Sequence, residues 1–79
     1  MQVFLRLYED ILAGDADAKD LPALPRLIYI VHGAATVGGQ ALADAAAWAG
    51  EGAVTLAPAP QGVTAWRFEV AADGAAAGA

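Results

Sequence analysis

The chain of 79 residues contains no cysteine, no serine and no asparagine, and it has one histidine and one lysine. Without cysteine there is no disulfide and no thiolate zinc site. The absence of cysteine and serine also removes two strong side-chain nucleophiles. His32 has no second histidine or cysteine with which to bind a transition metal. We therefore expect no enzyme activity, no cofactor and no metal site, and we interpret His32 as a structural residue.

Basic residues are also scarce. Four Lys and Arg side chains stand against nine Asp and Glu side chains, so the net charge is −5. Because nucleic-acid phosphates attract Lys and Arg, we predict no direct binding to nucleic acid. The longest run of large apolar residues, 27–31, is too short to cross a bilayer. We also expect no signal peptide, because no basic segment followed by an apolar run opens the sequence. Together with the absence of disulfides, these features predict a cytoplasmic protein of a bacterial host cell, without membrane contact.

Alanine dominates what is present, with 22 of the 79 residues. A chain this short forms one small domain that buries only about 60% of its unfolded surface, and alanine favours helices while adding little to a core. We predict a single α+β domain over residues 1–70 and a flexible Ala/Gly tail over 71–79. Its small sheet would have three or four mainly antiparallel strands, with an alanine-rich helix on one face.

The first segment of the chain, residues 2–13, fits two patterns. Four large apolar residues recur at helical spacing, and Gly14 follows where helices commonly end, so an N-terminal helix is the favoured interpretation. These four residues are Phe4, Tyr8, Ile11 and Leu12. The alternative is a strand with Val3, Leu5 and Leu7 on one side. Residues 14–26 are predicted to form a loop, because glycine, aspartates and two prolines interrupt any period.

Residues 27–31 are apolar without alternation, which predicts a central strand covered on both faces. A helix is predicted over residues 40–49, because small apolar residues recur there at helical spacing. Residues 53–57 and 63–70 are predicted to form a hairpin around a connector with prolines and a glycine.

The last predicted strand alternates in character. Thr64, Trp66, Phe68 and Val70 share one face, and Val63, Ala65, Arg67 and Glu69 share the other. Such alternation is typical of a strand with one buried and one solvated face. Because the chain has so few large side chains, we expect both Trp66 and Trp48 to be used in the core.

Two loops begin like known ligand-binding loops and then depart from them. After the central strand, Gly39 and Gln40 occupy the positions of the lysine and the hydroxyl residue of a phosphate loop, so we predict no nucleotide site. The stretch from Asp15 starts like a calcium loop, but Lys19 and Arg26 stand at its fifth and twelfth positions. We therefore predict a solvated acidic loop.

Acidic residues gather in one short stretch. Five of the nine carboxylates lie between residues 9 and 20, and only Lys19 balances them. They are Glu9, Asp10, Asp15, Asp17 and Asp20. One interpretation is plain solvating charge that keeps an alanine-rich protein soluble. The functional hypothesis is that these five residues form an acidic surface that binds a basic partner protein, because opposite charge speeds association.

The acidic cluster, on a small cysteine-free chain, resembles phage-encoded inhibitors of the anti-CRISPR kind. The resemblance implies a protein that occupies Arg and Lys sites of a CRISPR effector complex and so blocks its binding to target DNA, as a DNA mimic. The residues that carry it are Glu9, Asp10, Asp15, Asp17 and Asp20.

A second resemblance covers residues 28–56 and is to the bacterial PATAN-type signalling domain. It is carried by Ile28-Tyr29-Ile30, Gly33, Ala41-Leu42, Trp48 and the Gly52 that precedes Val54. This order is similar to that family's strand, glycine, helix, tryptophan, glycine and strand, and it implies a non-catalytic interaction scaffold. A small homo-oligomeric structural protein, for which a homodimer is the simplest form, is the remaining alternative.

Overall fold

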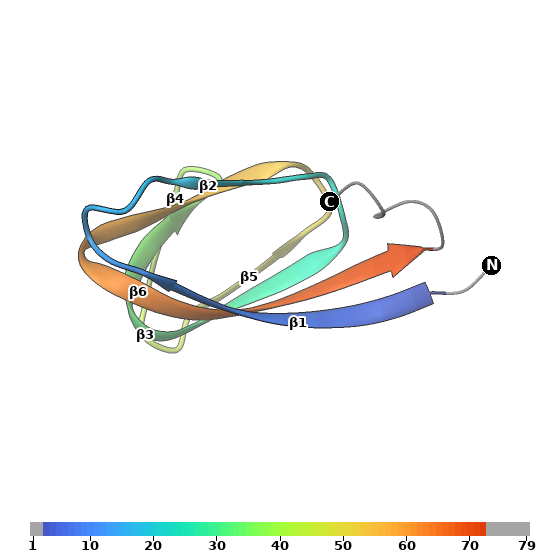
Figure 1. Ribbon diagram of the computed structural model, residues 1–79, viewed down its shortest axis with the longest axis horizontal. Helices are drawn as coiled ribbons and strands as arrows, with labels where there is room; N and C mark the ends of the chain where they lie inside the picture. The colour runs from blue at the N-terminus through green and yellow to red at the C-terminus, as the bar shows by residue number, and fades with distance from the viewer. Residues whose placement is uncertain (1–2, 73–79) are drawn as a thin grey trace.

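The computed structural model describes residues 3–72, and these form six strands joined by short turns (Figure 1). The strands are β1 (Val3–Leu12), β2 (Lys19–Leu21), β3 (Arg26–Val37), β4 (Gln40–Ala43), β5 (Ala47–Gly50) and β6 (Val54–Ala72). All pairings are antiparallel. Within this part of the chain there is no helix, and hence none that is long and apolar enough to cross a membrane.

The sheet folds over into two layers, and two long strands, β3 and β6, continue from one layer into the other (Figure 1). The first layer contains β1, the C-terminal half of β6, the N-terminal half of β3 and β5. The second layer contains β2, the N-terminal half of β6, the C-terminal half of β3 and β4. The inner faces of the two layers enclose the core.

The sheet changes direction where β3 and β6 lie next to each other at two glycines. The pairing shifts register between Ile30 and His32 and again between Gly33 and Ala35, and such bulges bend a strand sharply. Gly33 and Gly62 both have positive φ, at 90° and 83°. A Cβ atom at Gly33 would lie 2.2 Å from the carbonyl oxygen of Gly62, so only glycine permits the two backbones to approach this closely.

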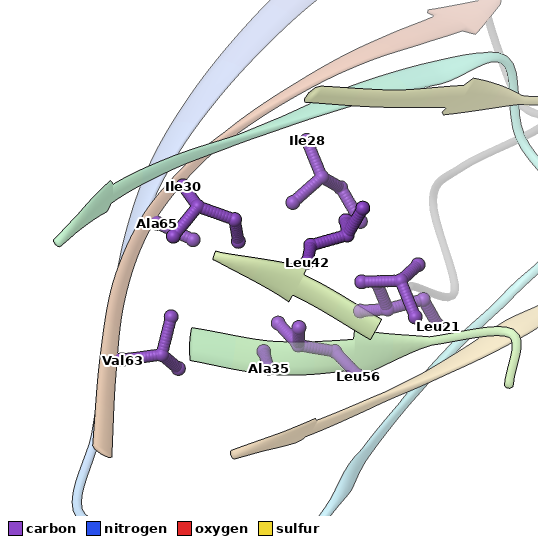
Figure 2. Close-up of a cluster of buried hydrophobic side chains, with 9 residues drawn as sticks. Leu21, Ile28, Ile30, Ala35, Leu42, Leu56, Val63 and Ala65 are labelled. Carbon is purple, nitrogen blue, oxygen red and sulfur yellow. The ribbon is translucent and has the colours of Figure 1, made fainter. Parts of the chain in front are cut away.

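The hydrophobic core lies between the layers, and both contribute to it (Figure 2). Its nine buried members are Leu21, Ile28, Ile30, Ala35, Val37, Leu42, Leu56, Val63 and Ala65. Ile28 and Ile30 point inward from the first layer toward Leu42 of the second layer, and Leu56 belongs to the same cluster. The core is small, as the composition predicts.

The predicted α+β fold is wrong, since residues 3–72 form an all-β sheet of six strands. The predicted helix over residues 2–13 is instead β1, paired with β6 over its whole length. Two features favour a strand here. A strand places successive side chains on opposite faces, so Tyr8 and Asp10 point inward while Leu7 and Ile11 point outward. A helix would instead place the negative charges of Glu9 and Asp10 near its C-terminal end, where the helix dipole disfavours them.

The predicted helix over residues 40–49 is also wrong, because this segment contains β4 and β5. Gly38 and Gly39 both have positive φ and form the two-residue turn of a hairpin between β3 and β4. A turn of this kind needs positive φ at both central residues. Ala45 has a φ of 66° and begins a second reversal before β5. These turns override the helical preference of the alanines.

The predicted hairpin over 53–57 and 63–70 is one continuous strand, β6, in which the connector 58–62 bends the strand without reversing it. The predicted loop 14–26 contains the short strand β2. The strand over 27–31 is confirmed and is paired on both sides, by β5 and β6. However, only one of its faces is covered. Of the predicted tail, residues 71 and 72 end β6, and residues 73–79 lie outside the described part of the chain.

The two faces of the C-terminal half of β6 are the reverse of the expected arrangement. Arg67 and Glu69 are buried between the layers, at 6% and 4% exposure. Trp66 lies on the opposite face and is 42% exposed. Trp48 is half-buried and packs against the core.

Candidate functional site

The five carboxylates of the predicted acidic surface do not lie together. Glu9 and Asp10 are neighbours in β1 and therefore point to opposite faces of the sheet. Asp10 is buried at 4% exposure, while Glu9 is exposed. Asp15 and Asp17 are exposed in the turn after β1. Asp20 lies in β2 of the second layer, where its Oδ1 accepts a hydrogen bond from Thr55 Oγ1 at 2.9 Å.

Asp10 binds two cations between the layers. Arg67 donates from Nε to Asp10 Oδ2 at 2.7 Å and from Nη2 to Asp10 Oδ1 at 3.2 Å. Lys19 donates from Nζ to Asp10 Oδ1 at 3.0 Å. The Arg67 guanidinium carbon also lies 4.3 Å from the centre of the Tyr8 ring, within the range of a cation–π contact. Asp10 thus ties β1 to β6 and to the start of β2.

The ionic network continues along the inner face of the first layer, from β6 to Arg26 on β3. Arg67 Nη1 donates to Glu69 Oε2 at 2.5 Å, and Arg26 Nε donates to the same oxygen at 3.0 Å. Arg26 Nη2 also donates to the carbonyl of Pro22 at 2.6 Å. We call these five charged residues the ion cluster: Asp10, Lys19, Arg26, Arg67 and Glu69.

Opposite charges favour the ionised forms of Asp10 and Arg67 despite their burial. Burial alone would raise the pKa of Asp10, but the hydrogen bonds from Arg67 and Lys19 and their positive charges outweigh it, so the pKa lies below its usual value. Burial would likewise lower the pKa of Arg67, but hydrogen bonds to Asp10 and Glu69 and their negative charges raise it. Every buried side-chain nitrogen and oxygen of the described part has a hydrogen-bond partner. The cluster therefore joins β1, β2, β3 and β6 through ionic hydrogen bonds.

The side of the first layer that points away from the core is uncovered, and we call this side the outer face. It consists of the side chains that point away from the core on β1, β6, β3 and β5, as the strand pairing places them. They are Leu5, Leu7, Glu9, Ile11, Leu27, Tyr29, Ala47, Ala49, Thr64, Trp66, Phe68 and Val70. In Figure 1, the blue strand β1 and the orange-to-red end of β6 run side by side in this layer.

Large apolar side chains on the outer face are unusually open to solvent. Leu5 is 70% exposed, Leu7 62% and Ile11 69%. Leu27, Trp66 and Val70 are exposed by about two-fifths each. Five of these six residues are aliphatic, so we take about 150 Å² for each fully exposed side chain, the lower end of the aromatic range. The six then present on the order of 500 Å² of apolar surface. That value lies toward the upper end of the roughly 300–600 Å² of the largest patch on a typical monomer.

Trp66 is held in position at the middle of the outer face. Its ring centre lies 6.3 Å from that of Tyr29, with an angle of 39° between the ring planes, a favourable tilted aromatic contact. Its Nε1 lies 3.5 Å from Glu9 Oε2, a long hydrogen bond on the opposite flank. A tryptophan that is already ordered loses little entropy when it binds, and tryptophan is enriched among the residues that dominate protein interfaces.

A hollow of about 500 Å³ lies beside the bend in the sheet. His32, Gly33, Ala43, Asp44 and Gln61 line it. Asp44 already accepts a hydrogen bond from the backbone N–H of Gly33 at 2.7 Å. His32 is exposed rather than enclosed in the fold. Among residues 3–72, no group of three or more His, Asp or Glu side chains lies close enough to hold a metal ion.

Comparison with protein-family models, with curated proteins and with solved structures finds no match for this chain. The fold and the arrangement of its side chains are thus the evidence for function. They single out the apolar outer face, which sequence reasoning did not identify.

Proposed function

We propose that this chain is a non-catalytic protein-binding domain and that the outer face is its binding surface. The supporting observation is the set of large apolar side chains left in water on β1, β3 and β6. The exposed fractions of the six largest add up to about three whole side chains. At about 2 kcal/mol for each buried side chain, covering them is worth on the order of 6 kcal/mol. A partner protein supplies that cover.

The composition of the outer face agrees with a protein interface. Protein interfaces are rich in aromatic and aliphatic residues at their centre and poor in charge. The outer face has Trp66 and Tyr29 in contact near its middle and Glu9 as its single charged residue. Apolar contacts of this kind are what the scaffold alternative expects, and they predict binding that tolerates salt. The proposed compartment is the cytoplasm of a bacterial cell, where the chain needs no disulfide.

The proposal is tested by photo-crosslinking from two matched positions. A photo-reactive amino acid replaces Leu7 on the outer face or Ala41 on β4, which is exposed in the second layer. Each purified chain is irradiated in a lysate of the source cells, and mass spectrometry identifies the adducts. We expect a defined protein adduct from position 7 and none from position 41. The absence of any adduct at position 7, or the same adducts at both, contradicts the proposal.

An acidic inhibitor remains the second candidate, now with a smaller set of residues. Asp15 and Asp17 are exposed together in the turn after β1, where they are free to meet basic side chains of a CRISPR effector complex. Asp10 is already bound by Arg67 and Lys19. This candidate predicts binding that weakens as salt is raised and is lost when both aspartates become lysine. Binding that survives the double reversal excludes this surface.

A further inference from the structure

We propose that the partner of the outer face is a second copy of this chain, so that two chains pack their outer faces together as a two-fold symmetric dimer. This inference rests on the proposed function, since it names the occupant of the same surface. A two-fold dimer uses one self-complementary patch on both subunits. The size, charge and shape of the outer face each favour that arrangement.

The apolar area matches what a dimer of small subunits needs. The six large apolar side chains present on the order of 500 Å². The half-buried Tyr29 and Phe68 and the exposed Ala47, Ala49 and Glu9 enlarge the outer face further. A standard stable interface buries about 800 Å² on each partner. One copy of the outer face therefore supplies most of the surface of such an interface without help from loops.

The charge distribution removes the main obstacle to self-association. Each chain carries a net charge of −5, and two such chains would repel each other if the acids lay at the interface. The structure instead places Asp10 inside, Asp20 on β2 of the second layer, and Asp15 and Asp17 in the turn that joins β1 to β2. Glu9, the single carboxylate of the outer face, lies within reach of Trp66 Nε1. A foreign partner selected by an acidic protein would be basic, and the outer face offers such a partner little to bind.

The shape of the outer face suits packing against another sheet. It is formed by four neighbouring antiparallel strands, β1, β6, β3 and β5, whose side chains alternate between the core and solvent. Two sheets stack face to face about 10 Å apart and interdigitate their side chains. The dimer would thus repeat outside each chain the same kind of packing that holds its two layers together. A chain of 79 residues has a small core, and small domains commonly gain stability by oligomerising.

The molar mass in solution tests the proposal. Sedimentation equilibrium of the purified full chain, from about 1 to about 200 µM, should give a mass that rises from 7.9 kDa toward twice that value. The dimer should persist when NaCl is raised from about 0.1 to about 1 M, because apolar contacts are not screened. A mass that stays at 7.9 kDa over the whole range overturns the proposal.

Substitutions locate the interface. Leu7→Lys should weaken the dimer by at least about tenfold, while the matched control Ala41→Lys on β4 should leave it unchanged. Far-UV circular dichroism checks the fold of each variant, and Leu5→Lys, at a more exposed position, replaces Leu7→Lys if the latter unfolds. If Leu5→Lys and Leu7→Lys dimerise as the parent does, the outer face is not the interface.

The two proposals fail in different ways. A monomeric chain that crosslinks from position 7 to another protein keeps the binding function and refutes the dimer. A monomeric chain with no adduct at position 7 refutes both. A dimer that is unaffected by Leu7→Lys but is weakened by Ala41→Lys moves the interface to the edge of the second layer and also refutes the outer face.

Discussion

Replacing Asp10 by asparagine removes one charge from the ion cluster and leaves the size of the side chain almost unchanged. In the parent, the two carboxylate oxygens accept hydrogen bonds from Arg67 and Lys19. In the variant, the amide keeps one acceptor and turns two N–H donors toward those donating cations. Arg67 retains Glu69 as its partner, and Lys19, whose side chain is 45% exposed, can turn to solvent.

The expected loss follows from the geometry. Two charges about 4 Å apart interact by about 4 kcal/mol at an effective dielectric constant of about 20. Part of this is offset because the neutral amide costs less to bury, whereas removal of one member of a buried pair costs about 3–5 kcal/mol in other proteins. We expect Asp10→Asn to lower the free energy of unfolding by about 3 kcal/mol. A domain of 79 residues has about 4–12 kcal/mol in total.

Urea denaturation followed by tryptophan fluorescence measures this loss, with all chains at one fixed concentration. With a slope near 1 kcal/mol per molar urea, the midpoint should fall by about 2–3 M. Asp15→Asn, at an exposed position in the turn after β1, is the matched control and should change the midpoint by less than about 0.5 M. Equal midpoints for Asp10→Asn and the parent, or equal losses in both variants, would refute the structural role of the cluster.

Three further outcomes follow from the same structure. The stability gap between the parent and Asp10→Asn should be largest above about pH 4, the usual value for an unfolded aspartate, and should close as pH falls further, because the pKa of Asp10 is lowered in the fold; a gap that widens in acid would show the opposite sign. Gly33→Ala should lower the free energy of unfolding in urea by more than about 2 kcal/mol, because its Cβ would strike the Gly62 carbonyl at positive φ. Gly52→Ala, whose Cβ meets open space, should be nearly neutral. Similar losses in both variants would show that the close approach of β3 and β6 does not require glycine at position 33. Ile28→Ala should cost about 2–5 kcal/mol, since Ile28 is fully buried in the core, and a loss below about 1 kcal/mol would mean that this core is loosely packed.

Local patterns predicted one element of the sheet well. The apolar run over residues 27–31 identified a strand in the centre of the sheet, and the structure pairs it on both sides. Gly38 and Gly39 held the signal for a hairpin, since two successive glycines are typical of the tight turn between strands. The alanines that follow favoured a helix by propensity, and tertiary pairing with β3 overrode that preference.

Which face of β6 is buried could not be predicted from alternation alone, because alternation defines two faces without saying which of them points to the core. Hydrophobicity favoured Trp66 and Phe68 for the inside. The inward positions instead hold Arg67 and Glu69, which are buried only because Asp10 and Arg26 complete their ionic network from distant strands. Such pairings join residues 43 and 57 positions apart, and no local pattern reveals them.

The five carboxylates between residues 9 and 20 were counted correctly, but they do not form one surface in the structure. Neighbouring residues in a strand point to opposite faces, so Glu9 and Asp10 were separated as soon as residues 3–12 became β1. The outer face was hidden for the same reason. Its members come from four strands and gather only after the sheet forms, although the strand alternative for residues 2–13 did place Leu5 and Leu7 on one side.

Quenching of Trp66 fluorescence by acrylamide tests most directly whether the outer face is covered when the protein works. In a Trp48→Phe chain, Trp66 is the single tryptophan, and its 42% exposure in the isolated chain makes it accessible to the quencher. We predict that quenching falls at least about twofold between about 1 and about 200 µM protein, or on adding whichever protein crosslinks to position 7. Quenching that stays constant under both conditions would contradict the account.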